Sequence, residues 1–273
     1  MDMKLLCGIA NVSRSGYYRW LKTADAPKRD YDDYLAIKEI FDKGRGKCGF
    51  RTIKMRLERE KHVVMNHKKI IRIKRAYGLI TKIRRRNPYK ATMKKTEAHR
   101  VFPNVLARRF DQMVPNRFFG TDITYLPFNC RFAYLAIVKD IASGEIVAWH
   151  VSPYITMELV LTMLGRMRAY PGAFIHSDQG FHFTNPAYIE KVRALDMLQS
   201  MSRKGNCIDN APVESFFGHF KDDVDYKGCR TFEDLRQLVE NYIRYYNYER
   251  AQWGRMKMTP VEYRDHLLSL VAA

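Results

Sequence analysis

Three carboxylates occupy positions where an acidic side chain can do chemistry. Asp122 lies in an apolar run between Thr121 and Ile123, where an aspartate is unfavourable unless it binds a ligand or accepts hydrogen bonds. Asp178 directly follows a second apolar run, and Glu214 stands at the start of a helical segment after "DNAP". If the three side chains converge, their hard oxygen atoms favour Mg²⁺ or Mn²⁺ over zinc. Two such ions suit an in-line displacement at a phosphodiester.

Each carboxylate also has a simpler interpretation. Asp122 could form hydrogen bonds within a sheet, and Asp178 could make an Asx turn before Gly180. Glu214 could stand in a first helical turn only because the helix dipole favours an anion there. Asp140, which ends another apolar run, is the alternative metal ligand and otherwise a turn residue.

The segments that must position these residues alternate between strands and helices. Runs rich in β-branched and aromatic residues predict strands at about 117–128, 131–140, 145–153, 173–177 and 195–200. Apolar periodicity predicts helices at about 155–168, from 185 onward, at 213–224 and at 231–248. The first three strands are expected to form an antiparallel meander. We therefore expect an α/β layer on a mixed sheet, in which the first strand, which contains Asp122, and the fourth, which ends just before Asp178, can be neighbours.

Positive charge is concentrated in the first part of the chain. The 273 residues carry a net charge of +19. Residues 1–110 contain 30 Lys and Arg against 10 Asp and Glu, whereas residues 111–273 contain 18 against 19. A basic module joined to a near-neutral one indicates a nucleic-acid-binding part on a body with another task. A basic surface kept for solubility is the alternative.

The basic part contains three amphipathic segments, expected as helices at about 31–43, 50–60 and 66–77. Asn66 can cap the third helix, and Gly78 follows its end. The last two helices predict a helix-turn-helix whose second helix enters the major groove, with a helical hairpin as the alternative. The basic face of that second helix supplies the candidate DNA contacts Lys68, Lys69, Arg72 and Arg75.

Cysteine usage and hydropathy exclude other classes of protein. The five cysteines form no C-x-x-C pair, so we expect reduced thiols and no zinc site. No apolar run reaches the roughly 18 residues that a membrane helix needs. The N-terminus shows no secretory signal, and we expect a cytoplasmic protein without a membrane partner.

Several blocks of the sequence resemble one known family. Asp178 and Glu214 are separated by 35 residues. The blocks are "GTDITY", "HSDQGFHFTN", "SMSRKGNCIDNAPVESFFGHFK" and "YIRYYNYERAQWGRMKMTPVEY". Together they resemble the second reading-frame product of the insertion-sequence-three family of bacterial transposases. Two departures are Phe119, where the family often has tryptophan, and "AQWG" in the closing block.

The resemblance implies a ribonuclease-H-like catalytic core, as in retroviral integrases, with a mixed five-stranded sheet and helices on both faces. It implies that Asp122, Asp178 and Glu214 are catalytic residues and the ligands of two Mg²⁺ (or Mn²⁺) ions. The implied activity is DNA cleavage and strand transfer, with terminal inverted repeats and target DNA as substrates. A homo-oligomer on DNA, an upstream reading-frame product as fusion or partner, and association with the bacterial nucleoid are also implied.

Further candidate DNA contacts lie around these carboxylates. Lys221 follows Glu214 by two helical turns and could meet a phosphate, or it is an ordinary solvated lysine. Arg203 and Lys204 lie in the loop before the catalytic helix. The roles of His176 and His182, on either side of Asp178, stay open.

The expected division of the chain has five parts. They are a short N-terminal segment at 1–27, an all-α helix-turn-helix-like region at 28–98, a basic linker at 99–116, the catalytic core at 117–225 and a helical extension at 226–273. Two other functions remain as alternatives: a DNA-binding regulatory or architectural protein whose core has decayed, and a nuclease of the same fold that does not join strands.

Overall fold

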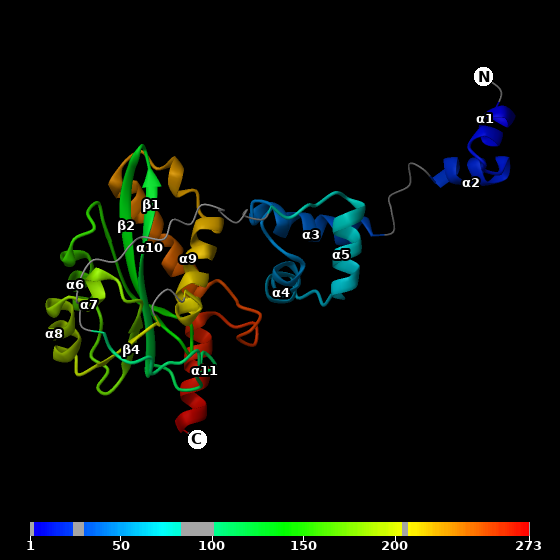
Figure 1. Cartoon of the computed structure of the whole chain (residues 1–273). Coiled ribbons are helices and arrows are strands. Elements are labelled where there is room, and N and C mark those ends of the chain that lie inside the picture. Colours follow the sequence, from blue (N-terminus) through cyan, green and yellow to red (C-terminus); the bar gives the residue numbers. More distant parts are fainter. Residues whose placement is uncertain (1–2, 24–29, 83–100, 204–206, 273) are drawn as a thin grey trace. The chain divides into compact units, whose positions relative to one another are not determined.

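The computed structural model describes residues 3–23, 30–82, 101–203 and 207–272. The chain divides into two compact units, Met1–Lys82 and Ile83–Ala273, and each is described by itself (Figure 1). Lys204 and Asn206, in the loop before the helix that carries Glu214, lie outside the described residues, as does the whole basic stretch from 83 to 100.

The smaller unit is entirely helical. Its helices are α1 (Met3–Ile9), α2 (Arg14–Thr23), α3 (Tyr31–Lys43), α4 (Phe50–Glu60) and α5 (His67–Ala76). The last three pack around isoleucines that recur at helical spacing, such as Ile37, Ile40 and Ile70, which are fully buried. Asn66 caps α5 as expected, because its side chain accepts a hydrogen bond from the Lys68 backbone at 2.9 Å.

The larger unit is built on a mixed five-stranded sheet, as expected. Its strands are β1 (Phe118–Phe128), β2 (Arg131–Asp140), β3 (Ile146–Ser152), β4 (Phe174–Ser177) and β5 (Leu198–Met201). They lie in the order β3-β2-β1-β4-β5. The first three form the predicted antiparallel meander, whereas β1 pairs with β4, and β4 with β5, in parallel.

Helices cover both faces of this sheet (Figure 1). One face carries α6 (Met157–Gly165), α7 (Phe181–Thr184) and α8 (Pro186–Ala194). The other carries α9 (Ala211–Asp223) and α10 (Phe232–Tyr248). The remaining elements are the short 3-10 helices η1 (Cys207–Asn210) and η2 (Tyr226–Gly228), and the helix α11 (Pro260–Ala272).

The alternation of side chains along β1 decides which residues meet which helices. Phe119 and Ile123 pack on the side of α6 and α8, whereas Leu126 and Phe128 pack on the side of α9 and α10. Since successive side chains point to opposite faces of a strand, Asp122 shares the α9 and α10 face with Leu126. This face is the one on which the candidate site must be sought.

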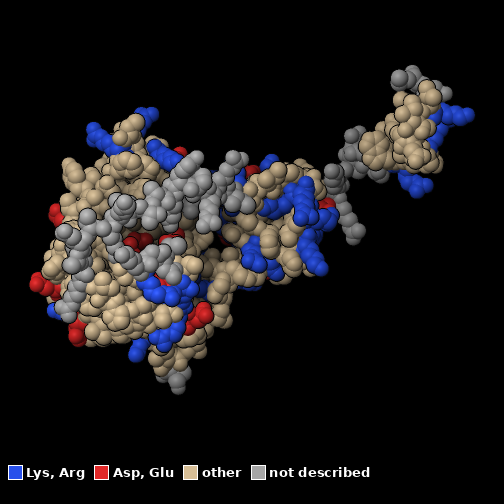
Figure 2. Space-filling view, viewed as in Figure 1, with Lys and Arg blue, Asp and Glu red and all other residues tan. Residues whose placement is uncertain are grey.

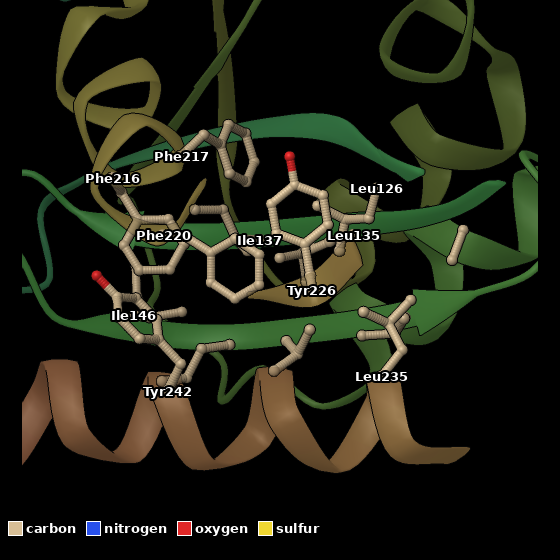
Figure 3. Close-up of a cluster of buried hydrophobic side chains, with 14 of the residues drawn as sticks. Leu126, Leu135, Ile137, Ile146, Phe216, Phe217, Phe220, Tyr226, Leu235 and Tyr242 are labelled. Carbon is tan, nitrogen blue, oxygen red and sulfur yellow. The ribbon is translucent and has the colours of Figure 1, made fainter. Parts of the chain in front are cut away.

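An aromatic core fixes α9 and α10 to the sheet. Phe216 and Phe220 of α9 and Tyr242 of α10 point at the same strand side chains, among them Leu135 and Ile137 (Figure 3). All five are buried. Burying one such side chain contributes roughly 1.5–3 kcal/mol, so this layer holds α9 in one orientation on the sheet.

Within the described ranges, no helix is both long and apolar enough to span a bilayer.

Candidate functional site

The strands β1 and β4 bring Asp122 and Asp178 to the same end of the sheet. The parallel ladder between them ends where Gly120 pairs with His176, and the same offset of 56 residues aligns Asp122 with Asp178. Neighbouring strands lie about 4.8 Å apart. Asp178 is the first residue beyond β4, whose last residue is Ser177. The expectation that these two strands are neighbours is therefore confirmed.

The start of α9 rests on β1 directly before Asp122. A Cβ atom on Gly120 would lie only 2.7 Å from Val213 Cγ2, so glycine permits this close approach. The side-chain amide of Asn210 donates a hydrogen bond to the Thr121 carbonyl at 3.1 Å. Glu214, which follows Val213 in the first turn of α9, is exposed to solvent.

Lys221 marks the second point of contact between α9 and β1. Its Nζ donates to the Thr124 hydroxyl at 2.6 Å and lies 5.1 Å from the centre of the Tyr125 ring. Thr124 is two residues beyond Asp122 and so shares its face of the strand. Because Glu214 and Lys221 are two helical turns apart, one side of α9 faces the stretch of β1 that carries Asp122.

The carboxylate side chains themselves make local hydrogen bonds. Asp122 Oδ1 accepts from the Ile123 N–H at 2.7 Å, and Asp178 Oδ1 accepts from the Gly180 N–H at 2.8 Å. A Cβ on Gly180 would lie 2.8 Å from that Asp178 oxygen, which explains the glycine. Among the residues that the structure describes, no three His, Cys, Asp or Glu side chains are gathered closely enough to hold a metal ion. Donor type and backbone placement fit Mg²⁺, and the side chains would have to turn toward one another.

His176 connects β4 to β5. It is fully buried, with Nδ1 2.9 Å from Ser200 Oγ and Nε2 3.1 Å from Ser202 Oγ. Burial lowers the pKa of His176 to about 4, against the opposing effect of Asp209. The imidazole is therefore neutral near pH 7, and its two ring nitrogens join β4 to Ser200 of β5 and to Ser202 just after it. His182 Nε2 lies 3.2 Å from the Ile155 carbonyl oxygen.

Asp209 gathers three side chains just before α9. Its buried carboxylate accepts hydrogen bonds from the Arg203 guanidinium and backbone at 3.0 Å, from Arg108 Nε at 2.7 Å and from Asn104 at 3.0 Å. These hydrogen bonds hold the pKa of Asp209 far below its usual range, and the bond from the Arg203 side chain has the largest effect. Arg203 was expected to contact DNA; the structure shows it paired with Asp209.

Asp140, the alternative metal ligand, is the last residue of β2 and leads into a turn. One carboxylate oxygen accepts from the Asn116 N–H at 2.9 Å. The other accepts from the N–H and the hydroxyl of Ser143, at 2.8 and 2.6 Å. Burial raises the pKa of Asp140. With one oxygen bound to the turn after β2 and the other to the backbone just before β1, the structure supports the turn role.

On the basic face of α5, two cations form ion pairs with acids at the start of α3, and two others are exposed to solvent. Lys69 pairs with Asp33 at 2.6 Å, and Arg72 pairs with Asp30 at 2.7 Å, both at the start of α3. Lys68 and Arg75 are exposed, and Lys and Arg side chains gather along α5 (Figure 2). The sequence pattern placed all four on one helix, but it could not show which of them α3 engages.

Three protein-family models match the chain. Two of them describe an integrase core domain and match residues 114–207 and 214–268. The third describes an HTH-like domain and matches residues 28–87. The integrase-core matches contain the whole sheet, and the HTH-like match contains α3, α4 and α5.

Individual proteins are similar over most of the chain. The match with InsK for insertion sequence element IS150 of Escherichia coli (strain K12), which is named as a transposase, is 34% identical over 263 residues and covers 94% of this chain and 91% of InsK. The match with the transposase InsF for insertion sequence IS3A of the same organism is 28% identical and covers 92% and 90%. A solved structure of the HTLV-2 integrase catalytic core domain in complex with magnesium has a TM-score of 0.42 and 15% identity, over 55% of this chain and 97% of that chain.

Proposed function

Because the chain belongs to the insertion-sequence-three family of bacterial transposases, we propose that it cuts and joins DNA strands with Asp122, Asp178 and Glu214 as its catalytic carboxylates. An integrase core gives the chain polynucleotidyl transferase activity in general. The proposal adds the residues that carry this activity and the order of its steps.

The proposal is supported by the way the fold places three residues around β1. The β1–β4 register supports a pairing of Asp122 with Asp178. The packing of Val213 on Gly120 supports the approach of Glu214 from α9. Carboxylates carried by a strand, a strand end and a helix would supply oxygen donors from three directions, as divalent cations require.

Two Mg²⁺ or Mn²⁺ ions held by these carboxylates would supply Lewis-acid activation of the attacking oxygen and charge stabilisation of the leaving one. Asp122, Asp178 and Glu214 would hold these ions through their carboxylate oxygens. Lys221, at the far end of the same side of α9, would hold a phosphate of the DNA strand next to the scissile bond. The first displacement leaves a 3′-hydroxyl, which then attacks a phosphodiester of the target without a covalent protein intermediate.

The helical unit supports the DNA-binding half of the proposal. Its HTH-like match indicates that it binds DNA, and we assign the terminal inverted repeats as its target. The exposed Lys68 and Arg75 of α5 are suited to contact phosphates or bases in the major groove. A homo-oligomer on DNA and an upstream reading-frame product as partner belong to the same proposal.

Purified protein, a labelled duplex that carries an insertion-sequence end and Mg²⁺ test the function directly. Asp122→Asn, Asp178→Asn and Glu214→Gln are each expected to lower cleavage and joining about 100- to 1,000-fold, the loss seen when one electrostatic group is removed. The matched control is Glu190→Gln, an exposed acid on α8 that should keep wild-type rates. Removal of the metal with a chelator should stop both steps and leave DNA binding.

The products separate the proposal from its two rivals. Joined strands support a transposase, cleavage without joining supports a nuclease, and binding without either supports a decayed core. Wild-type strand transfer by the Asp178→Asn variant would contradict the assignment of the site.

A further inference from the structure

Lys139 is a buried cation in the larger unit, with 3% of its surface exposed. Its Nζ donates hydrogen bonds to the Pro212 carbonyl oxygen at 2.9 Å and to the Tyr246 hydroxyl at 3.2 Å. These two bonds are called the Lys139 tie below. Since the desolvation of an ammonium group is unfavourable, a lysine is kept in such a place only when its donors are paired.

The side chain of Lys139 reaches α9 because of the residue opposite it. Lys139 pairs with Gly120 in the antiparallel ladder between β2 and β1. Cross-strand partners share one face of a sheet, so Lys139 lies on the face of α9 and α10. Gly120 has no side chain to block its path, and Val213 of α9 packs over the same glycine.

The Lys139 tie joins three elements at the start of α9. Pro212 is the second residue of α9, two residues before Glu214. Tyr246 belongs to α10, and its ring packs edge-on against Phe216 of α9, with 4.8 Å between the ring centres. The tie therefore sets the distance of the first turn of α9 from both β2 and α10.

Electrostatics shows that the tie does not serve to stabilise the helix. A cation near the first turn of a helix opposes the helix dipole. Burial lowers the pKa of Lys139, which shows that the buried charge is disfavoured. Burial also raises the pKa of Tyr246, but the nearby cations Lys139, Arg255 and Arg250 together lower it further, and the net shift is downward. An apolar residue would fill the same space without these penalties.

We propose that Lys139 is a positioning residue for the transposase reaction, with Tyr246 as its support. The tie fixes where the first turn of α9 rests on β1. It thereby keeps Glu214 next to the part of β1 that carries Asp122. This inference rests on the proposed function, because it assigns Lys139 a role only through the Glu214 carboxylate.

The decisive variant is Lys139→Met, which keeps a long unbranched side chain and removes the donors. We expect Mn²⁺ binding to the full-length protein, measured by titration calorimetry without DNA, to weaken about 10- to 100-fold, the range found when the support of a metal ligand is removed. Strand cleavage should fall by a similar factor and recover in part at high Mg²⁺. The urea midpoint should stay the same or rise, because the buried charge is gone.

Tyr246→Phe provides a second variant that keeps the packing of the ring and removes one partner of the tie. It should weaken Mn²⁺ binding less than Lys139→Met, by about 3- to 10-fold. Its matched control is Tyr188→Phe, because Tyr188 of α8 is fully buried and its hydroxyl has no hydrogen-bond partner among the described residues. That control should leave Mn²⁺ binding unchanged. Lys191→Met on α8 is the corresponding lysine control.

Asp122→Asn and Glu214→Gln, measured in parallel, separate the two proposals. If these variants lose activity while Lys139→Met and Tyr246→Phe keep wild-type Mn²⁺ binding, the positioning role is wrong and the proposed function stands. If Lys139→Met loses activity only in proportion to a lower urea midpoint, the lysine is structural and the positioning role is again wrong. If Asp122→Asn and Glu214→Gln stay active, both proposals are wrong.

Discussion

Single buried polar residues hold the segments around the candidate site together. Asp209 joins the loop at Arg203 to the segment that contains Asn104 and Arg108. Ser200, which lies beside His176, also accepts a hydrogen bond from the Val105 N–H at 2.9 Å. Because each of these groups is paired, the end of the sheet near Asp178 is braced from the segment that precedes β1.

The charge on Asp209 should be visible in the stability of the protein. The pKa of Asp209 is lowered in the folded state, so its carboxylate contributes stability above the unfolded value of 3.8 and loses that contribution as the pH falls through the folded value. We expect Asp209→Asn to lower the free energy of unfolding by about 2–3 kcal/mol at pH 7. Urea unfolding at pH 7, 5 and 3.5 should show an equal gap at the first two values and a smaller one at the third.

Asp196→Asn is the control for this measurement. Asp196 is exposed in a turn with φ of 54°, a conformation that asparagine tolerates. Its urea midpoint should match that of the wild type at all three pH values. A gap for Asp209→Asn that is as large at pH 3.5 as at pH 7 would contradict the role given to the charge.

Among the elements, the contact between α9 and β1 does most to place the candidate site. Gly120 is the point of closest approach, with Val213 above it and Ile141 Cδ1 3.1 Å from the position of an added Cβ. Lys221 makes the second contact, at Thr124. Because these two contacts are two helical turns apart, they set both the distance of α9 from β1 and the direction of its axis.

A methyl group at Gly120 should push α9 away from β1. We expect Gly120→Ala to lower the free energy of unfolding by about 1–3 kcal/mol, as overpacking does. Val213→Ala removes the nearest atom, so the double variant should be less destabilised than the two single changes predict together. A double-mutant cycle in urea, with strand cleavage measured in parallel, gives this coupling energy. Strict additivity would show that the two residues do not press on one another.

Local sequence patterns predicted the elements better than the contacts between them. The strands around Asp122 and Asp178 have clear β-type composition, and Asn66 and Pro186 mark helix starts, so these features could be expected from the sequence. The helix α1 was not expected, and α11 was expected only as part of the helical extension at 226–273, without bounds of its own. The partners of Asp209 and Lys139 lie up to 107 residues away, and no local pattern reports such a contact.

At the scale of the whole molecule, charge and site are divided between two units. The smaller unit carries the basic α5, and the larger one carries the sheet and the three candidate carboxylates. Each unit has its own buried core, the smaller around Ile37 and Ile40 and the larger in two layers on either side of the sheet. We therefore expect the smaller unit to bind DNA and the larger unit to bind the metal ions independently of each other.

Variants in α5 should change DNA binding alone. Lys68→Ala and Arg75→Ala together are expected to weaken binding to an element-end duplex about 10-fold or more and to reduce the slope of log K against log salt by about 2. Lys69→Ala should have a smaller effect, because Asp33 already partners its ammonium. Fluorescence anisotropy at several salt concentrations measures both quantities.

The same α5 variants should bind Mn²⁺ as the wild type does, whereas Glu214→Gln should lose Mn²⁺ affinity and keep DNA affinity. A loss of Mn²⁺ affinity in the α5 double variant would show that DNA binding and metal binding are not separated between the two units.

The parallel pairing of β1 with β4 has a consequence for the order of folding. β1, β2 and β3 are joined by short turns and can pair early, but β4 reaches β1 only after the chain through α6 has been placed. Pairing β4 with β1 closes a long loop of the chain between these two strands. The entropy lost in this closure adds a barrier to the step that aligns Asp178 with Asp122. We therefore predict that a partly folded chain holds Asp122 and Asp178 apart, and that the proposed cleavage activity arises only when β4, β5 and α9 have docked.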